Sequence, residues 1–455
     1  MLTDTIAAIA TPLGEGGLAV IRISGPTAFE VASQCFVAVR KPDWKPSEAA
    51  SHTVHYGHAC WRGKPIDEVL LTVFRAPRTF TREDVVEMSC HGGIVATQQV
   101  LQAILASGAR PAEPGEFTRR AFLNGRIDLA QAEAVADIIH ARTELALSAA
   151  NEQLEGKLSQ RINTLRDALM KTLAHVEAHI DFPDEDIAPD THTQLLQRLQ
   201  EAVEFMDRLL RTANEGQLLR RGIRAAIVGR PNSGKSSLLN ELLGRNRAIV
   251  SPIAGTTRDT IEETANVRGI PVVFIDTAGL RESEDLVEQE GIRRSRESLS
   301  AAELILQVFD RSEPLHPEDA QQLQALAKRK VIVICNKSDL PSQLTLPSHP
   351  HRVVETSCCT GAGLEQLRDT IKDLSWSGEL SSEMLQVTIN ARHQEALRRA
   401  RQATQAAAES LAGHLTLEVV AMELHIATNA VGEIVGKTTT EDLLDSIFSQ
   451  FCIGK

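Results

Sequence analysis

The spacing of hydrophobic and polar positions changes several times along the 455-residue chain. Residues 1–118 hold short apolar runs, such as residues 18–23 and 69–74, which glycine and proline separate. Short runs between turn residues are typical of strands, and we expect a compact α+β domain there. Residues 129–182 contain one glycine and no proline, and their alanine, leucine, glutamate and glutamine follow a helical period. This stretch predicts long helices.

The pattern changes again near Gly222, where five apolar runs are separated by helical segments: IRAAIVG, VVFID, LILQVFD, VIVICNK and VVETS. That alternation predicts a parallel sheet with crossover helices. It stops near Trp376, and helical spacing returns after Val387. We therefore expect a multidomain fold in which an α/β domain is inserted into a helical one. The expected parts are an α+β N-terminal domain at 1–118, an all-α helical domain at 119–218 and 378–455, and the α/β domain at 219–377.

The overall charge limits the kinds of partner that the chain can bind. Lysine and arginine number 48 against 60 for aspartate and glutamate, a net charge of −12. Such a chain does not coat nucleic acid or an anionic membrane by bulk charge, so any RNA contact must be local. The seven cysteines form no Cys-x-x-Cys pair, which indicates reduced thiols. With no basic leader and no apolar run of membrane-spanning length, we expect a cytoplasmic protein without a membrane partner.

Residues 229–236 fit the phosphate-loop pattern G-x-x-x-x-G-K-[ST]. A predicted strand at 223–228 precedes them and a predicted helix at 237–243 follows, which is the required context and disfavours a chance glycine-rich turn. Backbone N–H groups of such a loop cradle phosphates, Lys235 supplies positive charge to the β and γ phosphates, and the Ser236 hydroxyl can ligate Mg²⁺. The similar stretch at 432–438 has too few residues between its glycines, and we interpret it as a helix–turn junction.

Further motifs follow in the order expected of a GTP-binding domain. Asp276 ends the run VVFID and begins Asp-Thr-Ala-Gly279, where a carboxylate holds Mg²⁺ through water. The run VIVIC leads into Asn336-Lys337-Ser338-Asp339. The Asp339 carboxylate can accept from both N1–H and N2–H₂ of guanine, an edge that adenine lacks, which favours GTP by about 10⁴ or more. Ser357 fits the remaining guanine loop, and residues 255–259 lie where a Mg²⁺-binding switch threonine belongs.

The residue that usually orients the attacking water is missing. Leu280 follows Gly279 where Ras-like proteins carry glutamine, and an apolar side chain cannot position water. Asn232 offers an amide oxygen that could ligate a monovalent cation in place of an arginine finger. Simple loop geometry explains Asn232 equally well, because asparagine tolerates unusual backbone angles. Both readings stay open, and the first predicts K⁺-dependent hydrolysis.

The chain as a whole resembles the MnmE (TrmE) family of tRNA-modification GTPases. The phosphate loop and residues 253–259 are shared with that family and with relatives in ribosome assembly. More specific matches lie in the outer parts of the chain. They are Asp4-Thr-Ile6, Arg22-Ile-Ser-Gly25, Glu87 with His91-Gly-Gly93, Pro114 to Thr118, Asp128 to Glu133, and the closing Phe451-Cys-Ile-Gly-Lys455.

The resemblance implies an activity, its cofactors and its partners. It implies a homodimer that joins the FAD-dependent protein MnmG in a heterotetramer and adds a carboxymethylaminomethyl-type group to C5 of the wobble uridine of certain tRNAs. It also implies a one-carbon donor, 5-formyl- or methylene-tetrahydrofolate, bound by the N-terminal domain. The implied folate contacts are Arg22, Glu87, Arg126 and Lys455. Arg126 stands where some members carry lysine, which changes the geometry of that contact.

The resemblance also assigns residues of the inserted domain. K⁺ would be held by Asn232, Ser251, Ile253 and Thr256, and Mg²⁺ by Ser236 and Thr257. Glu288 matches the family's water-positioning glutamate and would act with Lys235 in hydrolysis, and Cys452 matches a cysteine proposed to be catalytic. The remaining implied GTP contacts are Ser233, Gly234, Ser237, Ala254, Gly255, Asp276, Thr277, Ala278, Gly279, Asn336, Lys337, Asp339, Ser357 and Cys358.

Several features have a plainer explanation. Cys452 can equally be a packed thiol. His52, His55, His58 and Cys60 lie in a β-rich segment and do not converge on a metal. Arginines at 392, 398, 399 and 401 could meet tRNA phosphates, although a solvated helix face is the commoner explanation. The alternative for the whole chain is a ribosome-assembly type G-protein switch without modification chemistry, which would not bind a reduced folate.

Overall fold

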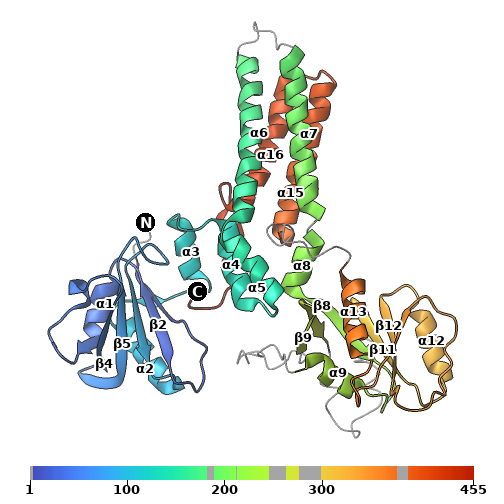
Figure 1. Cartoon of the computed structure of the whole chain (residues 1–455). Helices are drawn as coiled ribbons and strands as arrows, with labels where there is room; N and C mark the ends of the chain where they lie inside the picture. Colours follow the sequence, from blue (N-terminus) through green and yellow to red (C-terminus); the bar gives the residue numbers. More distant parts are fainter. Residues whose placement is uncertain (1–3, 182–188, 212, 245–262, 276–298, 377–387) are drawn as a thin grey trace. The chain divides into compact units, whose positions relative to one another are not determined.

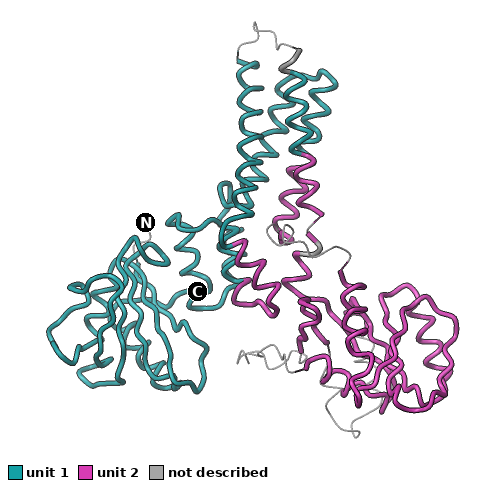
Figure 2. The backbone as a smooth tube through the Cα atoms, viewed as in Figure 1, with its two compact units in different colours: residues 1–136, 154–202, 402–455 teal, residues 137–153, 203–401 magenta. Residues whose placement is uncertain are grey.

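The computed structural model describes two compact units of the chain (Figures 1 and 2). Residues 1–136, 154–202 and 402–455 form the first unit, and residues 137–153 and 203–401 form the second. The described residues are 4–181, 189–211, 213–244, 263–275, 299–376 and 388–455. The domain boundaries expected from the sequence remain predictions.

The first unit contains a seven-stranded sheet with the order β3-β4-β5-β6-β2-β1-β7. Its neighbouring strands are antiparallel, except that β1 and β7 are parallel. The strands are β1 Ile6–Ile9, β2 Ala19–Ser24, β3 Phe36–Ala38, β4 Thr53–Trp61, β5 Lys64–Phe74, β6 Val85–Cys90 and β7 Arg110–Pro111. Helices α1 Ala28–Cys35 and α2 Ile94–Ala106 pack against the sheet, and the short 3₁₀ helix η1 spans Pro46–Glu48.

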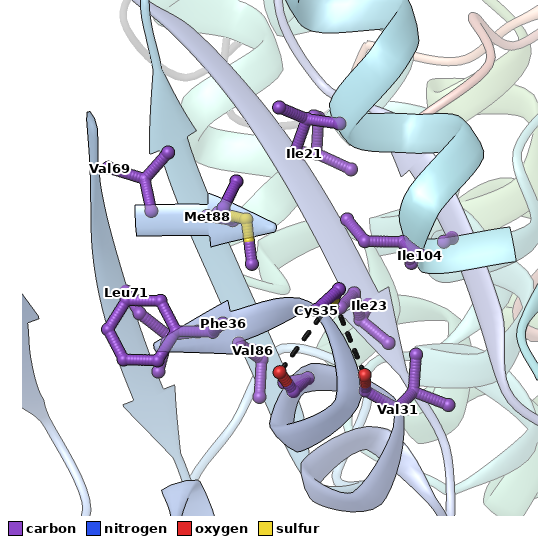
Figure 3. Packing of buried hydrophobic residues seen from close by; sticks show 14 of the residues in the cluster. Ile21, Ile23, Val31, Cys35, Phe36, Val69, Leu71, Val86, Met88 and Ile104 are labelled. Atoms are coloured by element: carbon purple, nitrogen blue, oxygen red, sulfur yellow. Dashed lines mark hydrogen bonds between the residues drawn. The ribbon is translucent and has the colours of Figure 1, made fainter. Parts of the chain in front are cut away.

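The core between this sheet and its helices decides which strand residues remain for chemistry. Ile21 and Ile23 of β2 and Met88 of β6 are fully buried in it (Figure 3). Successive residues of a strand point to opposite faces, so Arg22 and Glu87 lie on the other face of the sheet. They are direct cross-strand partners in the β2–β6 register. The sheet therefore brings together two of the residues for which the resemblance implies folate contacts.

Helices make up the rest of the first unit. Helices α6 and α16 lie side by side (Figure 1). Helix α16 ends at Val435, and the Gly436 N–H donates to the Gly432 carbonyl, which confirms that residues 432–438 form a helix–turn junction. The helices are α3 Glu116–Leu123, α6 Lys157–Asp181, α16 Leu417–Val435 and α17 Glu441–Phe448, and α4 Leu129–His140, α7 Pro189–Arg211 and α15 Ala391–Ala412 have residues in both units.

The second unit contains a six-stranded sheet with the order β13-β12-β11-β8-β10-β9. Apolar clusters cover both of its faces, as expected for parallel strands. The strands are β8 Ile223–Val228, β9 Glu263–Val267, β10 Ile270–Phe274, β11 Leu304–Asp310, β12 Val331–Asn336 and β13 Arg352–Glu355. The helices are α5 Glu144–Leu154, whose last residue is in the first unit, α8 Ala213–Arg221, α9 Lys235–Leu243, α12 Pro317–Ala325 and α13 Leu364–Ser375.

One strand departs from the parallel sheet that the sequence predicts. All five predicted runs form strands, but β9 is an additional strand and pairs antiparallel with β10. Arg268 and Gly269 connect the two strands, and both have positive φ, at 54° and 88°. Two such residues form the tight turn that suits the twist of a hairpin. Arg-Gly lacks the strong turn preference of Asn-Gly, which is why the sequence did not reveal this hairpin. No helix in the described parts of the chain is both long and apolar enough to cross a membrane.

Candidate functional sites

The phosphate loop connects β8 to α9 in the second unit. Its last glycine, Gly234, has a φ of 94°, and a Cβ there would lie 2.1 Å from Asn336 Nδ2. The position therefore requires glycine both for its backbone angle and for the close approach of the Asn336 side chain at the end of β12. Asn232 has a φ of 62°, in the left-handed region that asparagine tolerates. Loop geometry accounts for the residue type at Asn232, and its role toward K⁺ remains a prediction.

Helix α9 begins at Lys235, so its unpaired N–H groups face the loop. A helix N-terminus of this kind attracts anions. The Lys235 ammonium donates to the Arg230 carbonyl at 2.7 Å, and burial lowers the pKa of Lys235. Ser236 and Ser237 lie exposed in the first turn of α9. The predicted phosphate ligands are thus collected at one end of β8.

The guanine motif lies at the end of β12 and is bonded directly to the phosphate loop. Asn336 is 2% exposed, and its Nδ2 donates to the Ser233 carbonyl at 2.9 Å. Its Oδ1 accepts from the Thr356 hydroxyl at 3.3 Å and from Cys358 Sγ at 3.5 Å. One buried amide therefore holds together the loop expected to bind phosphates and the two loops expected to bind the base.

Asp339 is oriented by the loop after β13. The Ser357 hydroxyl, from a fully buried residue, donates to one Asp339 oxygen at 2.5 Å. The Ser357 oxygen in turn accepts from the Thr360 N–H at 3.2 Å. The Asp339 residue itself is exposed, so its carboxylate can meet a base from solvent. This arrangement suits a carboxylate that accepts two N–H donors from one edge of guanine.

Many predicted site residues lie outside the described residues. For these the expectations stand as predictions only. They are Ser251, Ile253, Ala254, Gly255, Thr256, Thr257, Asp276, Thr277, Ala278, Gly279, Leu280 and Glu288.

The second candidate site is in the first unit, where the chain end contacts the sheet. Arg22 donates to Glu87 at 2.8 Å and to the Gly454 carbonyl at 3.3 Å. The N–H of Phe117 donates to the carbonyl of Lys455 at 3.1 Å, and the Arg22 guanidinium lies 5.6 Å from the Phe117 ring centre. The fold thus brings Arg22, Glu87 and Lys455 together from three distant parts of the sequence.

Arg126 belongs to the same part of the first unit. Its guanidinium lies 5.1 Å from the ring centre of Phe80 and donates to the Thr79 carbonyl at 2.6 Å. Phe80 packs against the apolar cluster that contains Phe117, the ring beneath Arg22. Cys452 is exposed near the chain end, and its carbonyl accepts from the Gly115 N–H at 3.4 Å.

A buried arginine near this site was not singled out in the sequence. Arg120 is fully buried and donates to Asp4, Glu83 and Glu116 at distances of 2.9 to 3.3 Å. Its three acidic partners come from separate segments, and the bonds from Arg120 stabilise the packing of these segments around α3. The signal in the sequence was weak, because an arginine in a short helix usually faces solvent. Arg401, for which the sequence left both an RNA contact and a solvated helix face open, pairs with Asp207 at 2.6 Å, and an RNA contact remains a prediction.

Comparisons with known proteins agree across the chain. Residues 5–126 match the family model for the GTP-binding protein TrmE N-terminus, and residues 129–452 match that for the MnmE helical domain. The tRNA modification GTPase MnmE of Bacillus velezensis is 47% identical, covering 99% of this chain and 100% of the relative. That of Geobacillus thermodenitrificans is 48% identical, covering 99% of each. Among solved structures, the G domain of the T. maritima FeoB iron transporter is 26% identical with a TM-score of 0.24. The match covers 34% of this chain and 98% of the FeoB chain. The chain belongs to the MnmE family of tRNA modification GTPases.

Proposed function

We propose that this chain is a K⁺-stimulated GTP hydrolase that acts in tRNA modification. With an FAD-dependent partner, it adds a carboxymethylaminomethyl-type group to C5 of the wobble uridine, using a one-carbon unit from tetrahydrofolate. The observation that best supports the GTP site is the buried Asn336 amide. It joins the phosphate loop, through Ser233, to the loops after β12 and β13 that are expected to bind the base, through Thr356. The names of its relatives, tRNA modification GTPases, support the tRNA substrate.

Different residues at the strand ends are proposed to bind the phosphates, the base and Mg²⁺. The N–H groups at the start of α9 and the Lys235 ammonium offset the charge of the phosphates. Asp339, held by Ser357, selects guanine through two N–H donors. Ser236 and Thr257 are proposed to hold Mg²⁺ through their hydroxyl oxygens, because a hard cation prefers oxygen ligands.

Two further roles concern hydrolysis. A K⁺ ion bound by Asn232, Ser251, Ile253 and Thr256 would supply positive charge near the phosphates, where an arginine finger acts in other GTPases. Asn232 fits such a ligand set, because the residue is exposed in the phosphate loop and its amide supplies an oxygen. Glu288 is proposed to orient the attacking water in place of the missing glutamine.

The chain-end site of the first unit is proposed to bind tetrahydrofolate. Its residues fit that ligand, because Arg22, Arg126 and Lys455 offer cationic groups for the folate carboxylates and Glu87 can accept from pterin N–H groups. The Arg22 and Glu87 side chains are 17% and 25% exposed, so both are reachable from solvent while held by neighbours. Cys452, beside Lys455, is proposed to take part in the chemistry on the uridine. We further propose a cytoplasmic homodimer that associates with MnmG.

Hydrolysis tests the first part of the proposal. GTP turnover of the full chain is measured in KCl and in NaCl of equal ionic strength, and a rate that is higher in KCl is expected. Glu288→Ala should slow turnover and leave the Kd for GDP unchanged, whereas the control Glu318→Ala, an 84% exposed side chain on α12, should change neither. Equal rates in the two salts, or wild-type kinetics in the Glu288 variant, would remove K⁺ or Glu288 from the mechanism.

Folate binding and tRNA analysis test the second part. Calorimetry with 5-formyl-tetrahydrofolate should show binding that Arg22→Ala weakens. Nucleosides of tRNA from cells that lack the protein should lack the modified wobble uridine. No folate binding at millimolar concentration, together with intact tRNA modification, would favour the G-protein switch of ribosome-assembly type.

A further inference from the structure

The end of β11 contacts the loop of residues 336–339, here called the base loop, although β11 belongs to none of the GTP-binding motifs. Asp310, the last residue of β11, lies beside Asn336 in the register of the two parallel strands. One Asp310 oxygen accepts from Lys337 Nζ at 2.5 Å. The other accepts from the Ser312 N–H at 2.9 Å and from its hydroxyl at 2.6 Å. Both oxygens of the carboxylate therefore have partners that fix its orientation.

The Asp310–Lys337 pair holds a backbone conformation that lysine rarely adopts. Lys337 has a φ of 61°, in the left-handed region, which persists in non-glycine residues only where the surroundings enforce it. The Asp310 side chain is 8% exposed, so its charge depends on the partners it has. Although burial opposes it, the hydrogen bond from Lys337 holds the pKa of Asp310 below its usual range.

Arg311 holds the residues on either side of Lys337. Its N–H donates to the Asn336 carbonyl at 2.9 Å. Its guanidinium donates to the Ser338 carbonyl at 3.2 Å. Three consecutive residues of the base loop are thus each bonded to one of two consecutive residues at the end of β11.

We infer that Asp310 and Arg311 are positioning residues that set guanine selectivity, an inference that rests on the proposed GTP site. Asp339 follows directly after the three held residues, and it must meet two N–H donors of guanine at once. A two-point contact requires both distance and angle to be right, so it is sensitive to small shifts of the loop. Phosphate binding is less sensitive, because it depends on the loop before α9.

The test compares the affinities of two diphosphates that differ only in the 2-amino group of the base. Binding of GDP and of inosine diphosphate to the full chain is measured by calorimetry, and binding of ADP to wild type is measured in the same way as a test of the site itself. Wild type should prefer GDP, and Asp310→Asn should lower the ratio of the two affinities about tenfold, a size typical of coupled residues in one hydrogen-bond network. Arg311→Met should lower the same ratio. The control Asp373→Asn breaks the exposed pair with Arg352 and should leave the ratio unchanged.

The outcomes separate this inference from the proposed function. A wild type that binds ADP as well as GDP contradicts the proposed GTP site itself. If wild type selects GDP and both variants keep the wild-type ratio, this inference alone is overturned, including when both affinities fall equally. If Asp310→Asn does not fold, Arg311→Met decides, because it removes the bond to the Ser338 carbonyl and the ion pair with Glu355 at a partly exposed side chain, and leaves the backbone bond to Asn336 in place.

Discussion

The Asn336 amide offers the sharpest test of how the second unit builds its site. Asn336→Ala removes the donor to the Ser233 carbonyl and the acceptor for Thr356 and Cys358. It leaves the backbone of β12 unchanged. The variant therefore separates the side-chain link between the loops from the strand that carries it.

The size of the effect follows from burial. Ser233 is 3% exposed, so its carbonyl loses its Asn336 donor at a place that water reaches poorly. A buried polar group without a partner raises the free energy of the folded state by about 1–3 kcal/mol. The space left by the amide adds about 1 kcal/mol. We expect the free energy of unfolding of the second unit to fall by about 2–4 kcal/mol.

A tryptophan reporter confines the measurement to the second unit. The chain has three tryptophans, and Trp376, which is 5% exposed, packs in the second unit. Replacing Trp44 and Trp61 by phenylalanine leaves Trp376 as the only fluorescent tryptophan during urea unfolding. In that background, Asn336→Ala is compared with Asn240→Ala, an exposed position of α9 that should change stability by no more than about 0.5 kcal/mol.

The same variant should bind nucleotide more weakly. The phosphate loop and the base loops are no longer joined, so we expect the affinity for GDP to fall about tenfold or more, the effect of about 1.4 kcal/mol. An Asn336→Ala protein with the urea midpoint and the GDP affinity of wild type would refute the view that this amide organises the site.

Three other predictions concern single side chains. Asp339→Asn should move the preference from GTP toward xanthosine triphosphate by on the order of 10³-fold, because the amide N–H can meet a C2 carbonyl; unchanged competition data would contradict this. The hydrogen bond that the His91 ring donates to the Asp67 carboxylate raises the pKa of His91, so its NMR titration should lie above 6.5 and return toward that value in Asp67→Asn. The resulting stabilisation is present at low pH and is lost as the pH rises through the folded-state pKa. Burial raises the pKa of Cys35 to about 12, so a thiol reagent at pH 8 should modify the exposed Cys359 and reach Cys35 only after unfolding.

Features of the site that depend on residues close together in the sequence could be predicted from it. The apolar runs predicted β8 and β12, because burial on both faces of a parallel strand leaves a continuous hydrophobic signal. The motifs placed Asn336 at the end of a strand, where the structure has it, and Lys235 just before a helix at 237–243, which in the structure begins two residues earlier, at Lys235. The turn chemistry of the phosphate loop is local, and so is its signature.

Contacts between distant segments could not be predicted in the same way. The bond from Asn336 to Ser233 joins residues 103 positions apart, and periodicity carries no information about such partners. Asp310 looked like an ordinary strand end, and only the β11–β12 register places it beside the base loop. Arg120 was not singled out, because nothing near it in the sequence marks an arginine that the fold surrounds with three acidic partners.

Both candidate sites follow one physical rule, which links ligand binding to folding. Each depends on a partly or fully buried polar side chain whose partner is far away in the sequence, such as Arg22 and the Gly454 carbonyl, 432 positions apart. Such partners meet only when the unit is folded, so neither site exists in the unfolded chain. A ligand that binds only the folded state must stabilise the unit that holds its site, in proportion to the logarithm of its concentration. GDP should therefore raise the urea midpoint reported by Trp376, and a folate should not, unless the two units unfold together.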